Sequence, residues 1–406
     1  MKKKKTLLGI FLIPILIIIL IQGTLPFLTL VFSGIKSNLE ENTIQMDAHM
    51  VEKNQVILEN DMIEKWRSIY EEKDDLASEL QGILDENEID IQQFLASKEL
   101  QQKYLEQVFP TIVEELQYNT TSGAFLILAN DSSVDEEGSY QGFFVRDSDP
   151  QARTASNTDL LLERGNKRLA HNLSISLDTI WTTKFEMQGQ GKRAADDFFY
   201  QPYLAALEHK NSNMLDLGYW SKPFVLADNK TDMHEMITYS VPLKYDGEIY
   251  GILGSEVSVS YLENYFSVKD LDSSQNAGYA LMINKGDDQY EMLTGKGALY
   301  DAVARTDEEV TFTEKSSKNA LYQVKGAQIG KQSIFAIIKP LDIYSNNVPY
   351  TDTEWVLCGF VTEKSVYGLG DLVYARILEA IISSAILAAG CVYIMTRYVT
   401  KPVYRL

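Results

Sequence analysis

The sequence predicts an α+β protein in which a long N-terminal helix lies along two tandem antiparallel-sheet modules, with a transmembrane helix on either side. Three observations support this fold class. Predominantly apolar runs cover Leu7 to Phe32 and Ile377 to Met395. Between them, apolar residues before residue 123 recur at helical spacing. Beyond that point, short apolar runs alternate with turn-forming residues, which is the pattern of paired strands.

The first apolar run is long enough to cross a bilayer. As a helix it would extend about 39 Å, at about 1.5 Å per residue, against a hydrocarbon core of about 30 Å. A cleaved signal peptide is the alternative, but the run exceeds an ordinary signal-peptide core and no Ala-x-Ala-like cleavage site follows it. We therefore expect an uncleaved transmembrane helix over 7–33, bent at Pro14 and Pro26.

Basic residues flank both predicted spans on the side away from the central region. They are Lys2 to Lys5 in a short tail over 1–6, and Arg397, Lys401 and Arg405 after the second span at 372–396. Because cytoplasmic flanks are enriched in lysine and arginine, both termini are predicted to be cytoplasmic. Residues 34–371 are then extracytoplasmic.

The net charge and the number of cysteines limit the possible partners and location of the protein. The chain has 406 residues and a formal net charge of −20, which argues against nucleic acid or anionic lipid as a partner of the outer domain. Its two cysteines are Cys358 and, inside the second span, Cys391, so no disulfide framework is expected. An exported domain of this size without disulfides is typical of a bacterial envelope. The predicted location is therefore a bacterial plasma membrane.

A helical stalk is predicted over 34–122. Its first helix, from about Asn38 to Leu84, would extend about 70 Å and carries an apolar stripe with steps of three, four or seven residues. The stripe consists of Leu58, Met62, Trp66, Ile69, Leu76, Leu80 and Ile83. It suits either a parallel partner helix, which would give a homodimer, or burial against the chain's own sheets. A second helical stretch, Ile89 to Gln117, contains Pro110, which should bend it.

Two sheet modules follow, a larger one over 123–270 and a smaller one over 271–366. In the larger module we predict strands at Gly123–Asn130, Tyr140–Arg146, Asp216–Leu226, Glu235–Leu243 and Ile249–Val259, a helix at Asp196–Leu207, and a closing turn at Tyr261–Phe266. Asp246-Gly247 marks a hairpin turn. In the smaller module we predict strands at Gly278–Asn284, Ala320–Lys325, Ser333–Lys339 and Glu354–Val361, with a polar loop over 342–353.

No catalytic or metal-binding motif is present in the sequence. The four histidines lack metal-ligand spacing, and Gly189-Gln-Gly191 and Gly295-Lys296 each lack the rest of a phosphate-binding loop. No Gly-x-Ser-x-Gly elbow occurs. We therefore expect no enzyme activity, metal or cofactor in this chain. A surface hydrolase built on a carboxylate pair is the residual alternative, because 57 acidic residues leave many such pairs open.

Three stretches in the larger module carry a resemblance to a known family. They are Gly218-Tyr-Trp-Ser-Lys-Pro-Phe224, Ile237-Thr-Tyr-Ser-Val-Pro-Leu243 and Gly247-Glu-Ile-Tyr-Gly-Ile-Leu-Gly-Ser-Glu-Val257. In order and spacing they resemble the double Cache sensor domains of bacterial transmembrane receptors, and the resemblance covers Ile35 to Lys364. The residues over 397–406 resemble the opening of a HAMP-type linker.

The resemblance implies two PAS-like modules and a small ligand bound in the membrane-distal one. The amino-acid-binding subset of the family carries an Arg-x-Trp-Tyr motif and a downstream aspartate. This chain departs from that pattern, because Trp181 has neither the arginine nor the tyrosine beside it. The strand at 220–226 also lacks an aspartate at the usual place. An amino-acid ligand therefore has no motif support.

Aromatic residues crowd the distal module and are the candidate ligand contacts. The candidates are Phe199, Tyr200, Tyr219, Trp220 and Tyr239, with Arg193 and Asp216 as polar contacts. Aromatic walls with a few polar tips suit a small amphipathic or cationic ligand. The plainer interpretation is that these rings pack a helix against a sheet.

Together these features predict a receptor region that binds a small extracellular ligand and transmits a conformational change across the membrane. By resemblance, a cytoplasmic output domain after Leu406 would be a diguanylate cyclase, a histidine kinase or a chemoreceptor domain. The rival hypothesis is an adhesive or structural surface protein that binds no small ligand. In the second span, Arg376 and Glu379 lie three residues apart and are expected to pair or to reach the interface.

Overall fold

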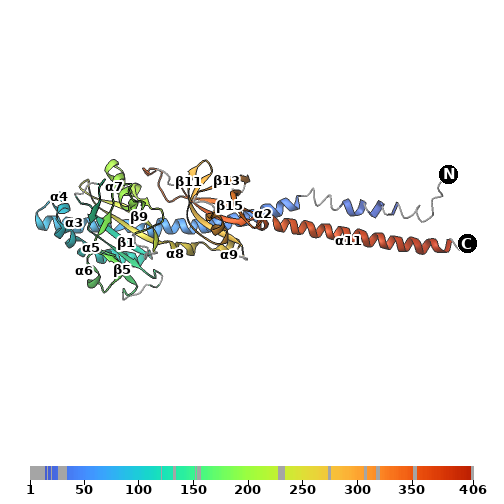
Figure 1. Ribbon diagram of the computed structural model, residues 1–406, viewed down its shortest axis with the longest axis horizontal. Helices are drawn as coiled ribbons and strands as arrows, with labels where there is room; N and C mark the ends of the chain where they lie inside the picture. Colours follow the sequence, from blue (N-terminus) through green and yellow to red (C-terminus); the bar gives the residue numbers. More distant parts are fainter. Residues whose placement is uncertain are drawn as a thin grey trace.

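Two β units follow one another along the long axis of the molecule, and a helical rod runs beside both (Figure 1). The computed structural model describes residues 14–15, 17–19, 21–25, 34–119, 121–130, 134–150, 152, 157–226, 234–272, 276–305, 309–316, 321–350 and 354–403. The smaller β unit lies between the larger one and the long C-terminal helix α11 (Glu363–Val403). The predicted α+β class, with a long N-terminal helix and two β units, is confirmed.

The N-terminal rod is not one uniform helix. Its segments are α2 (Ile35–Asn60), a π-helical segment η1 (Asp61–Trp66), a 3-10 segment η2 (Ser68–Glu72) and α3 (Lys73–Asn87). The continuous α-helix predicted from Asn38 to Leu84 is therefore wrong over 61–72. A π-helical turn departs from the α-helical hydrogen-bond pattern, and here the side chain of Ser255 donates to the carbonyl oxygen of Trp66. The irregular segment thus lies where the rod is bonded to the larger sheet.

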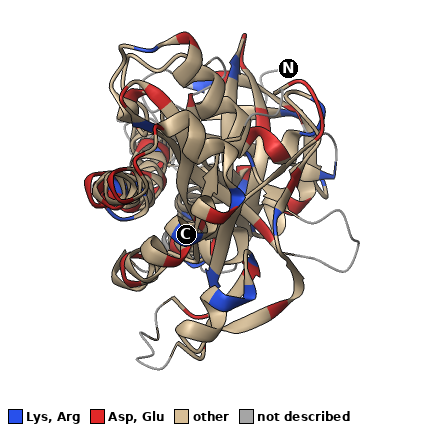
Figure 2. Ribbon diagram, turned by 90° about the vertical axis from the view of Figure 1, so that its left-hand side faces the viewer, with Lys and Arg blue, Asp and Glu red and all other residues tan. Residues whose placement is uncertain are grey.

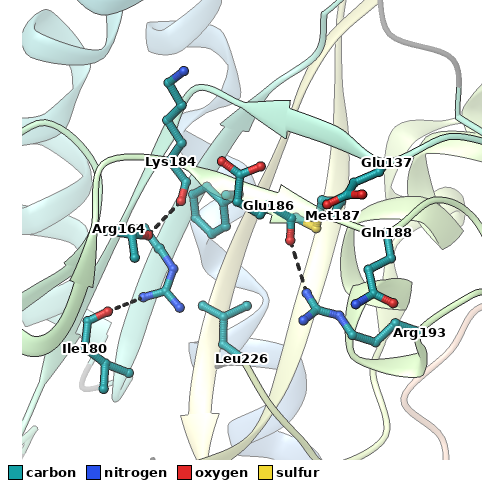
Figure 3. Close-up of a pocket in the computed structure, with 11 residues that line it drawn as sticks. Glu137, Arg164, Ile180, Lys184, Glu186, Met187, Gln188, Arg193 and Leu226 are labelled. Atoms are coloured by element: carbon teal, nitrogen blue, oxygen red, sulfur yellow. Dashed lines mark hydrogen bonds between the residues drawn. The ribbon is translucent and has the colours of Figure 1, made fainter. Parts of the chain in front are cut away.

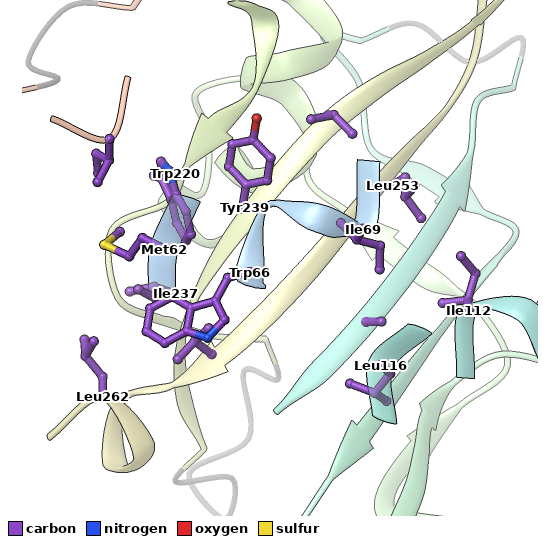
Figure 4. Packing of buried hydrophobic residues seen from close by; sticks show 14 of the residues in the cluster. Met62, Trp66, Ile69, Ile112, Leu116, Trp220, Ile237, Tyr239, Leu253 and Leu262 are labelled. Carbon is purple, nitrogen blue, oxygen red and sulfur yellow. The ribbon is translucent and has the colours of Figure 1, made fainter. Parts of the chain in front are cut away.

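The apolar stripe of the rod is buried within the chain itself. All seven of its side chains, Leu58 to Ile83, are at most 3% exposed. Trp66 contacts Trp220 edge to face in this cluster (Figure 4), and it also contacts Tyr265 edge to face. The layer is completed by α4 (Ile91–Ala96), which Asp90 caps, and α5 (Lys98–Asn119), which includes Pro110. The sequence left two arrangements open for the stripe, a contact with a partner helix or burial against the chain's own sheets. The structure shows the second, so this stripe is not available to a partner helix.

The larger unit is an eight-stranded sheet in the order β5-β4-β3-β1-β10-β9-β7, with β8 paired to β9. Its strands are β1 (Gly123–Leu128), β3 (Gly142–Asp147), β4 (Leu160–Arg164), β5 (Ser176–Thr182), β7 (Tyr219–Trp220), β8 (Phe224–Val225), β9 (Glu235–Tyr245) and β10 (Glu248–Ser258). The predicted β9–β10 hairpin is confirmed, with φ of 49° at Asp246 and 84° at Gly247, as an Asp-Gly turn requires. The pairing of β4 with β5 is parallel, which departs from the predicted antiparallel sheet.

The strand predicted from Asp216 to Leu226 is wrong. This segment forms a 3-10 turn, η4 (Met214–Leu217), followed by the short strands β7 and β8. Pro223 has no amide hydrogen to give to a sheet ladder, so it interrupts the pairing. A helix close to the predicted one is confirmed as α7 (Asp197–Glu208). It lies on the sheet face opposite the rod, with the small ribbon of β2 (Gly138–Tyr140) and β6 (Phe185–Met187).

The smaller unit is a closed six-stranded antiparallel barrel. Its strands are β11 (Ala277–Gly286), β12 (Gln289–Lys296), β13 (Glu309–Ser316), β14 (Leu321–Ile329), β15 (Gln332–Leu341) and β16 (Trp355–Thr362). The sequence pattern does not predict β12 and β13, because charged residues interrupt their apolar positions. It also misses α10 (Ala298–Ala304), whose Leu299 and Val303 are buried in the barrel's own core. The other four strands match predicted ones.

The barrel continues into the C-terminal helix without a loop, because β16 ends at Thr362 and α11 begins at Glu363. In the described part of the chain, one helix, over Glu363–Met395, is long and apolar enough to cross a membrane. The predicted first span, 7–33, lies largely outside the described residues. The predicted pair in the second span is confirmed, with Arg376 Nη1 2.9 Å from Glu379 Oε2.

The two helices nearest the predicted membrane run side by side (Figure 1). Lys36 Nζ on α2 lies 2.6 Å from Asp371 Oδ1 on α11. Gly370 permits the close approach, since a Cβ there would lie 3.3 Å from the Lys36 side chain. A displacement of α11 relative to α2 would therefore disturb the ion pair and the close contact at Gly370.

Candidate functional site

The larger unit holds a half-open cavity of about 370 Å³ on the side of the β2–β6 ribbon (Figure 3). Its lining residues are Glu137, Arg164, Ile180, Thr182, Lys184, Phe185, Glu186, Met187, Gln188, Arg193 and Leu226. They come from β4, β5 and β6, from the residue before β2, from the turn between β5 and β6, from the segment before α7, and from the residue after β8. Because strands from two sheets and a helix entry meet here, the cavity depends on the folded arrangement rather than on one local motif.

Arg164 forms one side of the cavity and is fixed in place. It is the last residue of β4 and is buried. Its Nη1 donates to the carbonyl oxygens of Glu163, at 2.9 Å, and Ile180, at 3.2 Å. The fully buried carboxylate of Glu163 lies 3.3 Å away and also meets Arg146 Nη1 at 3.5 Å. Charge-assisted hydrogen bonds of this kind hold a guanidinium in one orientation.

Arg193 forms the opposite side, with Leu226 between the two guanidinium groups (Figure 3). Its Nε donates to Asp196 Oδ1 at 2.9 Å, and its Nη2 reaches the carbonyl oxygen of Glu186 at 3.3 Å. Asp196 is fully buried, and its second oxygen accepts the N–H of Gln188 at 2.9 Å. Since Asp196 immediately precedes α7, the position of this arginine is tied to the start of that helix.

Basic side chains outnumber acidic ones on the lining, although each of the two arginines is paired with a buried carboxylate and the protein as a whole is acidic. Three basic side chains, Arg164, Lys184 and Arg193, face two acidic ones, Glu137 and Glu186. The whole chain has 57 acidic and 37 basic residues, and acidic side chains are spread over its helices and strands (Figure 2). Guanidinium groups match carboxylate and phosphate geometry. The cavity therefore suits a small molecule with an anionic group.

Apolar side chains supply most of the remaining lining, together with the polar Thr182 and Gln188. Phe185, Met187 and Leu226 line the cavity and also belong to the buried cluster on this face of the sheet. A pocket that combines an apolar wall with a few fixed polar groups favours a ligand that has both kinds of surface. The volume is that of a small metabolite rather than of a peptide or polymer.

The seven predicted contact residues lie in three different places. Arg193 lines the cavity. Phe199 and Tyr200 pack behind its apolar wall, in the same cluster as Phe185 and Met187, and burial raises the pKa of Tyr200. These three residues share the cavity's face of the sheet, so the structure brings this part of the predicted set together.

The remaining four lie elsewhere. Trp220 and Tyr239 are buried on the rod face of the sheet, with ring centroids 4.9 Å apart (Figure 4). Tyr219 and Asp216 contact the smaller unit: the Tyr219 ring lies 5.1 Å from that of Tyr350, and Asp216 accepts a hydrogen bond from a serine of the same loop. The structure therefore does not bring these four residues to the cavity.

Sequence reasoning missed Arg164, Lys184 and Leu226. A signal for the first was present, because Glu163-Arg164 ends the otherwise apolar run Leu160-Leu-Leu162. Adjacent charges at the end of a buried strand must be paired with opposite charges or with a ligand, since an unpaired buried charge is strongly unfavourable. Nothing local marked Lys184 or Leu226.

The sequence matches no protein-family model and no curated protein. Among solved structures, the chain is similar to the sensory domain of the Campylobacter jejuni chemoreceptor Tlp3 (CcmL), with 10% identity and a TM-score of 0.36 over 82% of this chain and 98% of that chain. It is also similar to the ligand-binding domain of the Pseudomonas fluorescens chemoreceptor CtaA in complex with L-isoleucine, with 12% identity and a TM-score of 0.39, over 83% of this chain and 98% of that chain.

A third similar structure is the ligand-binding domain of the Pseudomonas aeruginosa PAO1 chemoreceptor PctB in complex with L-Gln. Its identity is 16% and its TM-score 0.31, over 74% of this chain and 92% of that chain. These neighbours are sensory domains of chemoreceptors. At such identities and TM-scores, the likeness by itself decides neither the fold nor the ligand of this chain.

Proposed function

We propose that this chain is the sensing region of a bacterial membrane receptor and that it binds a small anionic molecule in the cavity between Arg164 and Arg193. The observation that carries the proposal is this pair of oriented guanidinium groups, each held by a buried carboxylate, on the walls of one cavity. A preformed cavity of metabolite size with oriented polar groups favours binding of a small molecule over a purely structural or adhesive role.

The connection from the larger unit towards the membrane supports a receptor role. The barrel's last strand, β16, continues directly into α11, so a shift of the barrel is applied to the start of the helix. α11 also packs along α2, the first segment of the rod. This helix passes beside the barrel, and the rod continues from it along the larger sheet. In this proposal α11 carries the signal through the membrane to a cytoplasmic output domain of the kind named by the resemblance.

The ligand proposal predicts a charge-dependent thermal shift. We expect at least one small carboxylate or phosphate compound to raise the melting temperature of the full chain in nanodiscs, while its neutral amide or alcohol isostere does not. A ligand at 100 times its Kd stabilises the folded state by about 2.7 kcal/mol. Arg193→Gln should weaken binding about tenfold to a hundredfold, because it removes a charge-assisted hydrogen bond worth about 1.5–3 kcal/mol.

Two variants control this experiment. Arg168→Gln removes an arginine of the same unit whose side chain is 73% exposed and lies outside the cavity, so it should leave binding unchanged. Arg193→Lys keeps the charge beside Asp196 but loses the planar fork, and its affinity should fall between those of wild type and Arg193→Gln. If a neutral isostere stabilised the chain equally, the proposed requirement for an anionic group on the ligand would be wrong. Turnover of any probe would point to the hydrolase alternative instead.

We further propose a parallel homodimer that uses a different face of α2 from the buried stripe. Met46, Val56 and Ile57 are 65%, 45% and 44% exposed on the outward side of this helix. Two copies anchored in the same membrane with parallel rods would cover these side chains against each other.

Cysteine crosslinking in native membranes tests the dimer. In a Cys391→Ser background, Val56→Cys should form a disulfide-linked dimer under mild oxidation. Leu58→Cys is the matched control, since Leu58 is 0% exposed on the same helix and should not crosslink. Monomers alone at Val56→Cys, Met46→Cys and Ile57→Cys would contradict this interface.

A further inference from the structure

The loop that joins the last two barrel strands reaches across to the larger sheet. Its hydrogen bonds to that sheet include Trp220 N–H to Tyr344 Oη at 2.8 Å, Ser345 Oγ to Asp216 Oδ1 at 2.6 Å, and Tyr350 Oη to the Leu217 carbonyl oxygen. We call this set of contacts, between loop residues 344–350 and segment 216–220, the clasp. It bonds both main-chain and side-chain groups of the segment that it holds.

Ring packing and an ion pair reinforce the clasp. The Tyr350 ring meets that of Tyr219 at 5.1 Å and 62°, and it packs against the small cluster that contains Leu217. Beside the clasp, Lys222 Nζ lies 2.7 Å from Glu291 Oε2 of β12. Residues far apart in the chain thus form a continuous contact between the two units.

The clasped segment is the least regular edge of the larger sheet. β7 has two residues and pairs with β9 only through Tyr219 opposite Ser240 and Trp220 opposite Tyr239. So short an edge strand has few ladder hydrogen bonds of its own, and it is held instead by the burial of Leu217 and Trp220 and by the clasp. A movement of this edge would pull directly on the loop.

Helix α7 links the cavity to the same edge. It begins next to Asp196, the carboxylate that holds Arg193 in the cavity wall. Along α7, Phe198 stacks on Phe224 at 5.2 Å, and Ala205 and Ala206 near its end pack in the cluster that includes Leu217. α7 therefore contacts the cavity through its first turn and the clasp through its last.

We infer that the clasp is the coupling element that carries the state of the distal cavity to the β16–α11 connection. This inference rests on the proposed receptor function and adds the route of its signal. A change at Arg193 tilts α7, α7 shifts the 216–220 edge, and the tyrosine loop transfers that shift to the start of β16. The rod formed by α2 and α3 holds the two units in place while the edge moves.

Hydrogen exchange measured by mass spectrometry on the full chain in nanodiscs tests this route without a ligand. Arg193→Gln should speed exchange of the β16 amides, Trp355 to Cys358, about fivefold, which corresponds to the loss of about 1 kcal/mol of local stability. In a Tyr344→Phe/Tyr350→Phe background, which keeps both rings but removes the clasp hydroxyls, Arg193→Gln should have no further effect on these amides. Arg168→Gln should have none in either background.

A reversible lock completes the design. Asp216→Cys with Ser345→Cys, in the phenylalanine background and with Cys391→Ser, should restore the effect of Arg193→Gln when oxidised and lose it when reduced. An equal effect of Arg193→Gln with and without the clasp hydroxyls would assign the coupling to the rod and overturn the inference. No effect of Arg193→Gln on β16 would also overturn it. Either result leaves the thermal-shift test of ligand binding intact, so the two proposals fail separately.

Discussion

Replacing Trp66 with alanine lowers the free energy of unfolding by about 3–5 kcal/mol, as expected for deleting a large buried aromatic side chain. Trp66 is 1% exposed, with edge-to-face contacts to Trp220 at 6.4 Å and Tyr265 at 5.7 Å. The loss removes both aromatic pairs and leaves a cavity between the rod and the larger sheet. Urea denaturation of the full chain in detergent, followed by circular dichroism, measures the change.

The control for this variant lies on the same rod. Glu79→Ala removes an exposed side chain of α3 outside the proposed dimer interface and should change the unfolding free energy by less than about 0.5 kcal/mol. A loss below about 1 kcal/mol for Trp66→Ala would mean that the rod and sheet do not depend on this contact. The expected large loss would show that the contact of Trp66 with the larger sheet contributes to the stability of the fold.

The second large effect is a fall in stability as the pH rises from about 4 to about 7, caused by Asp47. This α2 residue is 7% exposed, and its Oδ2 makes no hydrogen bond with the described residues. Burial, together with the charge of Asp272, raises the pKa of Asp47 to about 7. Because the folded state holds this proton to higher pH than the unfolded state, ionisation above pH 7 disfavours folding by up to about 4 kcal/mol.

Asp47→Asn isolates this contribution. The variant should be more stable than wild type at pH 8 and equal to it near pH 4, with the difference growing between these values. Glu64→Gln, which removes an exposed carboxylate from the same rod, should leave the pH profile unchanged. The measurement is the urea midpoint of the full chain at each pH. A difference between Asp47→Asn and wild type that is the same at all pH values would show that Asp47 is not protonated in the folded state.

Local sequence patterns predicted those elements whose formation needs only neighbours in the chain. The β9–β10 hairpin follows from Asp246-Gly247 between two alternating strands, and α7 follows from the spacing of its apolar residues. The stripe from Leu58 to Ile83 is the buried side of the rod, although the rod is not one continuous α-helix. These predictions hold because turn chemistry and periodicity act over a few residues.

Predictions failed where a distant part of the chain changes the local structure. The segment from Asp61 to Glu72 has the periodicity of an α-helix, but the contact of Trp66 with the sheet and the bond from Ser255 accompany a π-helical and a 3-10 segment there. The sequence from Asp216 to Leu226 has the pattern of a strand. In the structure, hydrogen bonds from the barrel loop to Asp216 and Leu217 accompany an irregular conformation there. Neither effect is visible within a window of the sequence.

The candidate site shows the same division between local and tertiary information. The sequence by itself determined the α+β class, the apolar helix at Ile377 to Met395 and the acidity of the chain, and it singled out Arg193, which lines the cavity. Only the tertiary structure decided that Arg164 lies opposite Arg193 and that Trp220 and Tyr239 belong to the core. The physical reason is that composition and periodicity fix which residues leave water, whereas the pairing of strands far apart in the chain fixes which of them face a common cavity.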